Sequence, residues 1–317
     1  MNANQPPGDG ARDGAGHETD APASTPAAAS TPAASLRDEL RRVADRLRSA
    51  GVPDPEVDAE LLAGHVLGLS RGGVQARAVI GAGLEASDAA ALEALVARRA
   101  AREPVQHLTG RAPFRALDLQ VGPGVLVPRP ETELVAQLAI DALRAVPDPE
   151  PIAVDLGTGS GAIALALATE VPHARVVGVE LSPDALAWAR RNAAEVGAPN
   201  LELVEGDLAT ALPELDGRVA VVVSNPPYVP AALVPVDAEV HLHDPAVALY
   251  GGDDGLDVIR PLSRRAFALV RPGGSVVIEH AEHQSAAIAA ILAADGWRAV
   301  AHHRDLNLRD RATTAVR

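Results

Sequence analysis

Cysteine is absent from this chain, and aromatic residues are scarce: two each of Phe, Trp and Tyr occur among 317 residues. Without cysteine there is no disulfide framework and no thiolate chemistry. With so few aromatic residues, the core has to be built mostly from Val, Leu, Ile and Ala. Apolar runs long enough to cross a bilayer are also missing, so the sequence predicts no membrane partner.

Acidic side chains outnumber basic ones in this chain. The chain has 28 Lys and Arg side chains against 42 Asp and Glu, which leaves a net charge of -14 with His neutral. A surface this acidic repels nucleic acid unless a local basic patch overrides it. The charge balance therefore argues against direct DNA binding, and we expect none.

The first 35 residues lack the side chains that build a core. No Leu, Ile, Val or Phe precedes Leu36, and "APASTPAAASTPAAS" is of low complexity. Such a segment cannot bury enough apolar surface to offset its ordering entropy. It also lacks the basic start and apolar block of a secretion signal. We therefore predict that residues 1–35 form a disordered, dispensable tail on a cytoplasmic protein.

Residues 36–104 carry helical patterns. Three helices are predicted, in "LRDELRRVADRLRSAG", in "DPEVDAELLAGHVLGL" and, after the cap Ser87, in "AAALEALVARRAARE". In the second helix the side chains expected to point inward are Val57, Leu61, Val66 and Leu67. Short amphipathic helices in succession indicate a small bundle. Its arginines, Arg99 and Arg102 among them, are expected to form a solvated face.

Strand patterns begin after this bundle. Residues 105–126 are predicted to form a β-hairpin linker with turn-forming Gly-Pro-Gly at 122–124. Residues 127–317 alternate between strand and helix, and seven strands are predicted, in "PIAVDL", "ARVVGVEL", "LELVEGD", "RVAVVVSN", "GSVVIEH", "WRAVAHH" and "RATTAVR". This alternation indicates an α/β fold, with a doubly wound, mostly parallel seven-stranded sheet. The last two strands have no helix between them, so a hairpin should add one antiparallel strand.

The first of these strands leads into a glycine-rich loop, "DLGTGSGAIAL". Gly157, Gly159 and Gly161 permit a tight turn and close approach of a ligand to the backbone. Glu180 ends the second strand, where an acidic residue can hydrogen-bond both hydroxyls of a ribose. This combination predicts a nucleotide-like site. The loop alone also fits the dinucleotide pattern Gly157-x-Gly159-x-x-Ala162, so an NAD enzyme stays open at this point.

The second feature at the same sheet edge is "SNPPYV" at 224–229, which ends the apolar run "RVAVVV". Because proline has no N–H and disfavours helix for the residue before it, Asn225 and Pro226 should be extended and present unused acceptors. The Asn225 side-chain oxygen and the Pro226 carbonyl can each accept one hydrogen of a planar NH2 group. Tyr228 supplies a flat apolar wall for that group.

A crevice with these two features suits methyl transfer. S-adenosyl-L-methionine carries a methyl group that its sulfonium makes electrophilic. An amide or aromatic amine nitrogen is a poor nucleophile, because its lone pair is delocalised. Two fixed acceptors on its hydrogens return electron density and aim the lone pair, and such positioning and fixed dipoles supply much of the rate.

Four segments together resemble the HemK/PrmC family: "DLGTGSGAIALALA", "SNPPYV", "VLVPRPETELV" at 125–135 and "ALYGGDDGLDVIRPL" at 248–262. The resemblance covers residues 36–317. It implies an S-adenosyl-L-methionine-dependent protein-(glutamine-N5) methyltransferase. The implied substrate is the Gln of the Gly-Gly-Gln motif in class-1 peptide chain release factors. It also implies that the N-terminal helical domain helps to dock the release factor.

The resemblance assigns roles to individual residues. The implied cofactor-binding residues are Gly157, Thr158, Gly159, Ser160, Gly161, Glu180, Asp207, Leu208 and Asn225. The implied substrate-binding residues are Asn225, Pro226, Pro227, Tyr228, Phe114 and Arg129, and Asn225 and Pro226 are the implied catalytic pair. No metal is implied.

Three segments depart from the family's pattern, at 243–245, 279–284 and 305–313. The second contains His280 and His283 about one helical turn apart. Because the chain has no HExxH motif and no cysteine, these are expected to be ordinary histidines rather than metal ligands.

Three other functions fit parts of the sequence. An amino-group DNA or RNA methyltransferase would use "NPPY" to grip a flipped base, but the acidic balance and the lack of an obvious target-recognition domain argue against it. A ribosomal-protein glutamine is an alternative target for the same chemistry. A non-catalytic adaptor would not need the glycine loop, Glu180 and Asn225 together.

Overall fold

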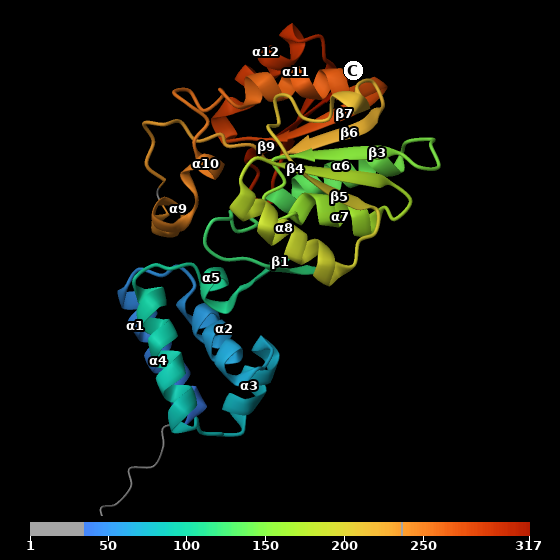
Figure 1. Cartoon of the computed structure of the whole chain (residues 1–317). Helices are drawn as coiled ribbons and strands as arrows, with labels where there is room; N and C mark the ends of the chain where they lie inside the picture. The colour runs from blue at the N-terminus through green and yellow to red at the C-terminus, as the bar shows by residue number, and fades with distance from the viewer. Residues whose placement is uncertain (1–34, 236) are drawn as a thin grey trace, which may run out of the picture.

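The computed structural model describes residues 35–235 and 237–317, and the predicted tail lies outside them except for Ser35. An N-terminal bundle of helices is joined through a short hairpin to a larger α/β part (Figure 1). Across the described ranges, no helix is both long enough and apolar enough to traverse a membrane.

The bundle contains more helices than the sequence patterns indicate. Its helices are α1 (Leu36–Ser49), α2 (Pro55–Leu67), α3 (Arg71–Val79), α4 (Ala86–Ala100) and α5 (Val105–Thr109). Helix α3 was not predicted, because two consecutive glycines interrupt its apolar pattern. Ser70 caps it by accepting a hydrogen bond from the Gly73 backbone N–H. Helix α4 begins at Ala86 with Glu85 as its N-cap, so the predicted cap at Ser87 is wrong.

The predicted inward face of α2 is partly wrong, although Val66 and Leu67 do pack against the core of the bundle. Leu61 is among the exposed large apolar residues, whereas Asp58, Ala59, Leu62 and Ala63 are buried. The helix turns Asp58 inward because that carboxylate has a charged partner, Arg99, inside the bundle. Asp58 Oδ2 accepts a 2.7 Å hydrogen bond from Arg99 Nε, and both side chains are almost completely buried.

Arg99 connects the bundle to the α/β part. Its Nη1 lies 2.8 Å from Glu239 Oε1 on α9 (Ala238–His243), and Arg102 Nε donates to the same carboxylate at 2.9 Å. In Figure 1, α9 extends from the α/β part toward the bundle. These two arginines therefore do not form the solvated face that the sequence suggested.

The hairpin between the two parts has a different turn from the one predicted. Strands β1 (Arg111–Phe114) and β2 (Leu117–Gln120) pair antiparallel, with the turn at Arg115 and Ala116. Arg115 has a φ of 54°, in the left-handed region. The Gly-Pro-Gly segment follows β2 and packs against α8 (Pro183–Val196), where Trp188 Nε1 donates to the Pro123 carbonyl at 3.2 Å.

The seven-stranded sheet confirms the predicted fold class. Its strands are β3 (Ile152–Leu156), β4 (Arg175–Glu180), β5 (Leu201–Glu205), β6 (Val219–Ser224), β7 (Val270–Glu279), β8 (Arg298–Arg304) and β9 (Asp310–Val316). They are ordered β5-β4-β3-β6-β7-β9-β8, and β9 pairs antiparallel with both β7 and β8. The closing hairpin and the single antiparallel strand are therefore as expected.

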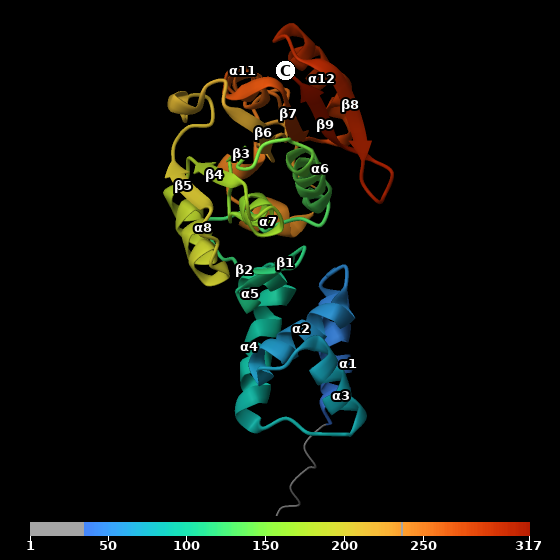
Figure 2. The ribbon, with the colours of Figure 1, turned by 90° about the vertical axis from the view of Figure 1, so that its right-hand side faces the viewer.

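Helices cover both faces of this sheet (Figure 2). On the face nearer the bundle lie α6 (Thr132–Arg144), α7 (Ala162–Glu170) and α8 (Pro183–Val196); α11 (Ile259–Leu269) and α12 (Ser285–Ala294) lie on the other. Residues 162–168 of α7 are all buried, which suits a helix that is apolar on every side. Helix α6 was not predicted, and the short helices α9 and α10 (Ala246–Leu249) lie between β6 and α11.

Candidate active site

The strand order places the candidate site. After β3 the chain adds β4 and β5 on one side, and β6 then pairs on the other side of β3. In a doubly wound sheet this switch opens a crevice beyond the carboxyl ends of the strands. The glycine loop, Glu180 and the "SNPPYV" segment follow β3, β4 and β6 at that edge, so the structure brings together the features that the sequence singled out.

The glycine loop requires glycine for its backbone and leaves room for a ligand. Gly157, Gly159 and Gly161 have φ of 79°, 58° and 86°. A Cβ built on Gly157 or Gly159 meets no protein atom within 4 Å, so the space beside these two residues is open. Gly159 N donates a 2.7 Å hydrogen bond to Glu180 Oε2, and Ser182 N donates to Oε1 at 2.9 Å. Two backbone donors thus fix the Glu180 carboxylate at the site.

Asp155 hydrogen-bonds to the glycine loop and to the start of α7 from their buried side, and it was not identified from the sequence. The side chain is fully buried; its Oδ2 accepts from Thr158 Oγ1 at 2.6 Å and from Ala164 N at 3.2 Å. Burial raises the pKa of Asp155 to about 7, although both hydrogen bonds oppose the rise. An acidic residue at the end of a core strand, directly before a glycine loop, was the available signal.

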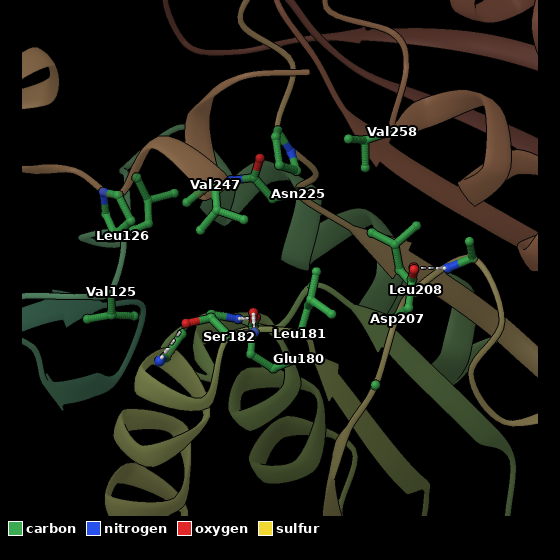
Figure 3. Close-up of a pocket in the computed structure, with 18 of the residues that line it drawn as sticks. Val125, Leu126, Glu180, Leu181, Ser182, Asp207, Leu208, Asn225, Val247 and Val258 are labelled. Carbon is green, nitrogen blue, oxygen red and sulfur yellow. Dashed lines mark hydrogen bonds between the residues drawn. The ribbon is translucent and has the colours of Figure 1, made fainter. Parts of the chain in front are cut away.

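A first pocket, of about 350 Å³, opens over the loop and is called the donor pocket below. Of the predicted cofactor-binding residues, Gly157, Gly159, Glu180, Asp207, Leu208 and Asn225 line it. Figure 3 shows Glu180 and Asn225 on opposite sides of this pocket. Its volume lies within the range of small-molecule sites. The open space at the glycines and the fixed carboxylate fit an S-adenosylmethionine nucleoside.

Three predicted cofactor residues do not line the donor pocket. Thr158 and Ser160 are buried, and the Ser160 carbonyl accepts from Asn192 Nδ2 at 2.9 Å. Gly161 caps α7 and packs near Leu165 and Ala189. Thr158 and Ser160 alternate with Gly157 and Gly159 and face the protein side of the loop, whereas Gly161 already belongs to the start of α7. The structure adds Leu181 and Val258 as apolar lining residues that were not among the predicted site residues.

A second pocket, also of about 350 Å³, lies on the other side of Asn225 and is called the acceptor pocket below. Tyr228 and Arg129 line it, as does Asn225, while Pro227 lines the donor pocket. The charge of Arg129 is already engaged, because its Nη2 lies 2.5 Å from Oδ2 of the buried Asp244. Asn225 is the only one of the predicted substrate-binding residues that lines both pockets.

The segment 248–262 and Gln284 hold the "SNPPYV" segment in place. Val229 N donates to the Leu249 carbonyl at 2.8 Å, and Gln284 Nε2 donates to the Tyr228 carbonyl at 2.9 Å. A Cβ on Gly251 would lie 2.6 Å from the Pro227 carbonyl oxygen, so only glycine permits this approach. Among the described residues, none donates a backbone or side-chain hydrogen bond to the Pro226 carbonyl, but Pro226 itself is buried and lines neither pocket.

Asn225 is oriented by a residue that sequence reasoning did not single out. Its Nδ2 donates to Oγ1 of Thr132, the first residue of α6, at 3.2 Å. Tyr228 Oη lies 3.4 Å from Oε1 of Glu279, a fully buried residue at the end of β7. Burial raises the pKa of Tyr228 above its usual range and that of Glu279 to about 7. Both phenol and carboxyl are therefore largely desolvated beside Asn225.

Phe114 is not at the mouth of the site. Its side chain is 1% exposed and packs in the core with Leu119, Val135 and Ile163, so it lines neither pocket. It is drawn into the core because a large aromatic side chain gains more from burial than from facing water. His280 is also a core residue, with its ring nitrogens 2.9 Å from the Ala281 carbonyl and 2.8 Å from Thr313 Oγ1.

Comparison with known families matches both parts of the chain. A model described as the PrmC N-terminal domain matches residues 38–110. A model described as a methyltransferase domain matches residues 153–238, which include the glycine loop, Glu180 and the "SNPPYV" segment. The first matched range spans the bundle to the end of α5, and the second runs from β3 through β6 to the first residue of α9.

Individual proteins similar to this chain are as follows. A release factor glutamine methyltransferase of Streptomyces coelicolor is 52% identical over 279 residues, covering 87% of this chain and 96% of the relative. A 4-amino-L-phenylalanine/4-methylamino-L-phenylalanine methyltransferase of Streptomyces pristinaespiralis is 40% identical over 226 residues, covering 70% and 76%. The solved protein-(glutamine-N5) methyltransferase (release factor-specific) of Alicyclobacillus acidocaldarius is 28% identical, covers 62% of this chain and 98% of its own, and has a TM-score of 0.38. At 52% identity over almost the whole length of the first relative, this chain belongs to the family of S-adenosylmethionine-dependent release factor glutamine methyltransferases.

Proposed function

We propose that this chain methylates the side-chain amide nitrogen (N5) of the glutamine in the Gly-Gly-Gln motif of class-1 peptide chain release factors, in the cytoplasm. One observation carries the proposal: Asn225 lines both the donor pocket and the acceptor pocket. A group held by Asn225 from the acceptor side therefore faces the donor side. This is the arrangement that direct transfer between two bound molecules requires.

The residues of the chain divide the work between binding and orientation. When bound, S-adenosylmethionine supplies the electrophilic methyl group. Glu180 holds ribose hydroxyls, because its oxygens keep free lone pairs besides those used by Gly159 and Ser182. Asn225 Oδ1 and the Pro226 carbonyl accept the two hydrogens of the glutamine NH2. This pair of fixed acceptors directs the nitrogen lone pair at the donor pocket and compensates positive charge as it develops there.

The helical bundle supports a protein substrate rather than a free amino acid. Its own core is separate from the core of the sheet, and it contacts α9 through Arg99 and Arg102. Residues of α9 and its flanks, Asp237 and Val240, line the acceptor pocket. A protein that docks on the bundle therefore has a short path to Asn225.

The relative that methylates 4-amino-L-phenylalanine makes a small aromatic amine a second candidate substrate. An aromatic amine presents the same planar NH2 group to the two acceptors. It has no use for a docking bundle, which favours the release factor. Nucleic acid is disfavoured by the net charge of -14, and a ribosomal-protein glutamine remains a rival protein substrate.

The test is a parallel methylation assay with labelled S-adenosylmethionine. The acceptors are a class-1 release factor, the same factor with Gln→Ala in its Gly-Gly-Gln motif, ribosomal proteins, 4-aminophenylalanine and DNA. We expect label in the native release factor alone. Equal labelling of the Gln→Ala factor, or preferential labelling of another acceptor, contradicts the proposal.

A further inference from the structure

Glu279 carries a buried carboxyl close to the "SNPPYV" segment, and this residue lines neither the donor pocket nor the acceptor pocket. Glu279 is fully buried, and in the sheet its neighbour Ile278 pairs with Ser224, the residue before Asn225. Its Oε2 has no partner of ordinary hydrogen-bond geometry among the described residues. A buried carboxylate without a cation is costly to a fold, so its place beside the reacting groups calls for an explanation.

We propose that Glu279 and Thr132 are positioning residues that determine which end of the Asn225 amide faces the substrate. The proposed series has two links: Asn225 Nδ2 donates to Thr132 Oγ1 at 3.2 Å, and the Thr132 hydroxyl turns its hydrogen toward the neighbouring Glu279 carboxyl. Thr132 is 4% exposed, so water does not compete for its hydroxyl.

Thr132 can select one end of the Asn225 amide because of how few hydrogens its hydroxyl can donate. A threonine hydroxyl has one hydrogen to donate. When that hydrogen points at the Glu279 carboxylate, Oγ1 can only accept, and it then selects the NH2 end of Asn225. Oδ1 is left to accept from the substrate NH2. If the amide turned over, it would present donors to a substrate that also donates, and the contact to the reacting nitrogen would be lost.

The surroundings of Glu279 allow its carboxylate to accept a hydrogen bond from the Thr132 hydroxyl. Tyr228 Oη lies 3.4 Å from its Oε1, and among neighbouring charges Glu131 opposes its ionisation while Arg311 favours it. Because burial raises its pKa to about 7, the carboxylate is the better acceptor above neutral pH. Below that pH Glu279 carries its own proton and competes with the Thr132 hydroxyl as a donor.

This inference rests on the proposed function only for the identity of the methyl acceptor. The native enzyme is therefore assayed first against the native release factor and its Gln→Ala form. If neither is methylated, the proposed function fails. The positioning series is then measured with whichever acceptor the native enzyme does methylate, as the ratio of variant to native rates.

The first experiment removes the hydroxyl. Single-turnover transfer is measured at saturating S-adenosylmethionine and acceptor in Thr132→Val, Thr132→Ser and, as a matched loss of a buried hydroxyl elsewhere, Thr313→Val in β9. We expect Thr132→Val to slow transfer about 10-fold or more, since misplacement of a reacting group is that costly. Thr132→Ser should recover most of the rate, and Thr313→Val should keep it. A native rate in Thr132→Val overturns the proposal.

The second experiment asks whether Glu279 acts through Thr132. Glu279→Gln should slow transfer in the native background and flatten the decline in rate as pH falls through about 7, yet cost little more in the Thr132→Val background. Cofactor affinity by calorimetry should be unchanged in both variants. Equal losses from Glu279→Gln in the two backgrounds, or an unchanged pH profile, overturn the proposal. Should Thr132→Val not fold, a native rate and pH profile in Glu279→Gln overturn it alone.

Discussion

Arg99 of the bundle and Glu239 of α9 are joined by a charged contact of 2.8 Å in which the arginine is almost completely buried. Burial opposes ionisation of Glu239, but hydrogen bonds from Arg102 and Arg99 outweigh it and lower the pKa of Glu239 to about 2. Glu239 therefore stays ionised from neutral pH well into the acidic range and keeps its charged contact with Arg99. It connects the proposed docking bundle to the helix beside the acceptor pocket.

Glu239→Gln should therefore weaken use of the protein substrate. We expect KM for the release factor to rise several-fold and unfolding free energy to drop by about 1–3 kcal/mol, the scale for hydrogen bonds to charged groups. Cofactor affinity should stay the same, because no residue of α9 lines the donor pocket. The control is Glu202→Gln, which breaks an exposed 2.9 Å pair with Arg175 and should change little. An unchanged KM in Glu239→Gln would separate the bundle from substrate use.

Glu180→Gln should weaken S-adenosylmethionine binding. An amide has one oxygen, so it cannot accept from both Gly159 N and Ser182 N and also from a ribose. We expect a loss of about 1–3 kcal/mol by calorimetry. Glu205→Gln, at the end of the neighbouring strand and outside the donor pocket, is the matched control. Equal affinities in native enzyme and Glu180→Gln would show that the carboxylate does not hold the cofactor.

Asn225→Ala should leave cofactor binding within a few-fold of native but slow methyl transfer. One of the two acceptors for the substrate NH2 is then missing, and loss of one such preorganised contact costs about 10²-fold. Single-turnover labelling of the release factor measures the step directly. Asn307→Ala, in the exposed turn between β8 and β9, serves as the control. Transfer at the native rate in Asn225→Ala would remove Asn225 from the mechanism.

The buried carboxyl of Glu279 should make stability depend on pH in a defined direction. Because burial raises its pKa from 4.5 to about 7, the folded state holds the proton more tightly than the unfolded chain. Its contribution to unfolding free energy is therefore greatest below about pH 4 and is lost as pH rises to about 7. Relative to Glu279→Gln, the native protein should lose at most about 3 kcal/mol between these limits. Urea unfolding of both proteins at pH 5 and 8 measures this difference, and an opposite sign would contradict the burial argument.

Local patterns were sufficient to predict much of the fold and the centre of the site. All seven strands were predicted from runs of β-branched residues and their turns, and the helix-free connection between β8 and β9 indicated their hairpin. The glycine loop and the "SNPPYV" segment were expected to share one crevice, because parallel strands end at the same edge. Asn225 and Glu180 follow from that reasoning, since each directly ends a strand or follows one.

Other features depend on contacts between distant elements. Arg99 looked like a surface arginine, yet Asp58 and Glu239 meet it inside the molecule. Phe114 looked like a site residue and is a core residue. Neither result follows from periodicity, because burial and ion pairing are decided by whatever packs opposite a side chain.

The sequence by itself determined where backbone must turn and where acceptors are presented, since glycine and proline act through their own φ and their own missing N–H. Only the tertiary structure decided which side chains pack against the segment that presents those acceptors. Thr132 begins α6 and meets Asn225, and Glu279 ends β7 and meets Tyr228, because β7 pairs with β6 and α6 packs over both. Hydrogen bonds reach only about 3 Å, so partners that are far apart in the chain become visible only once its elements are packed.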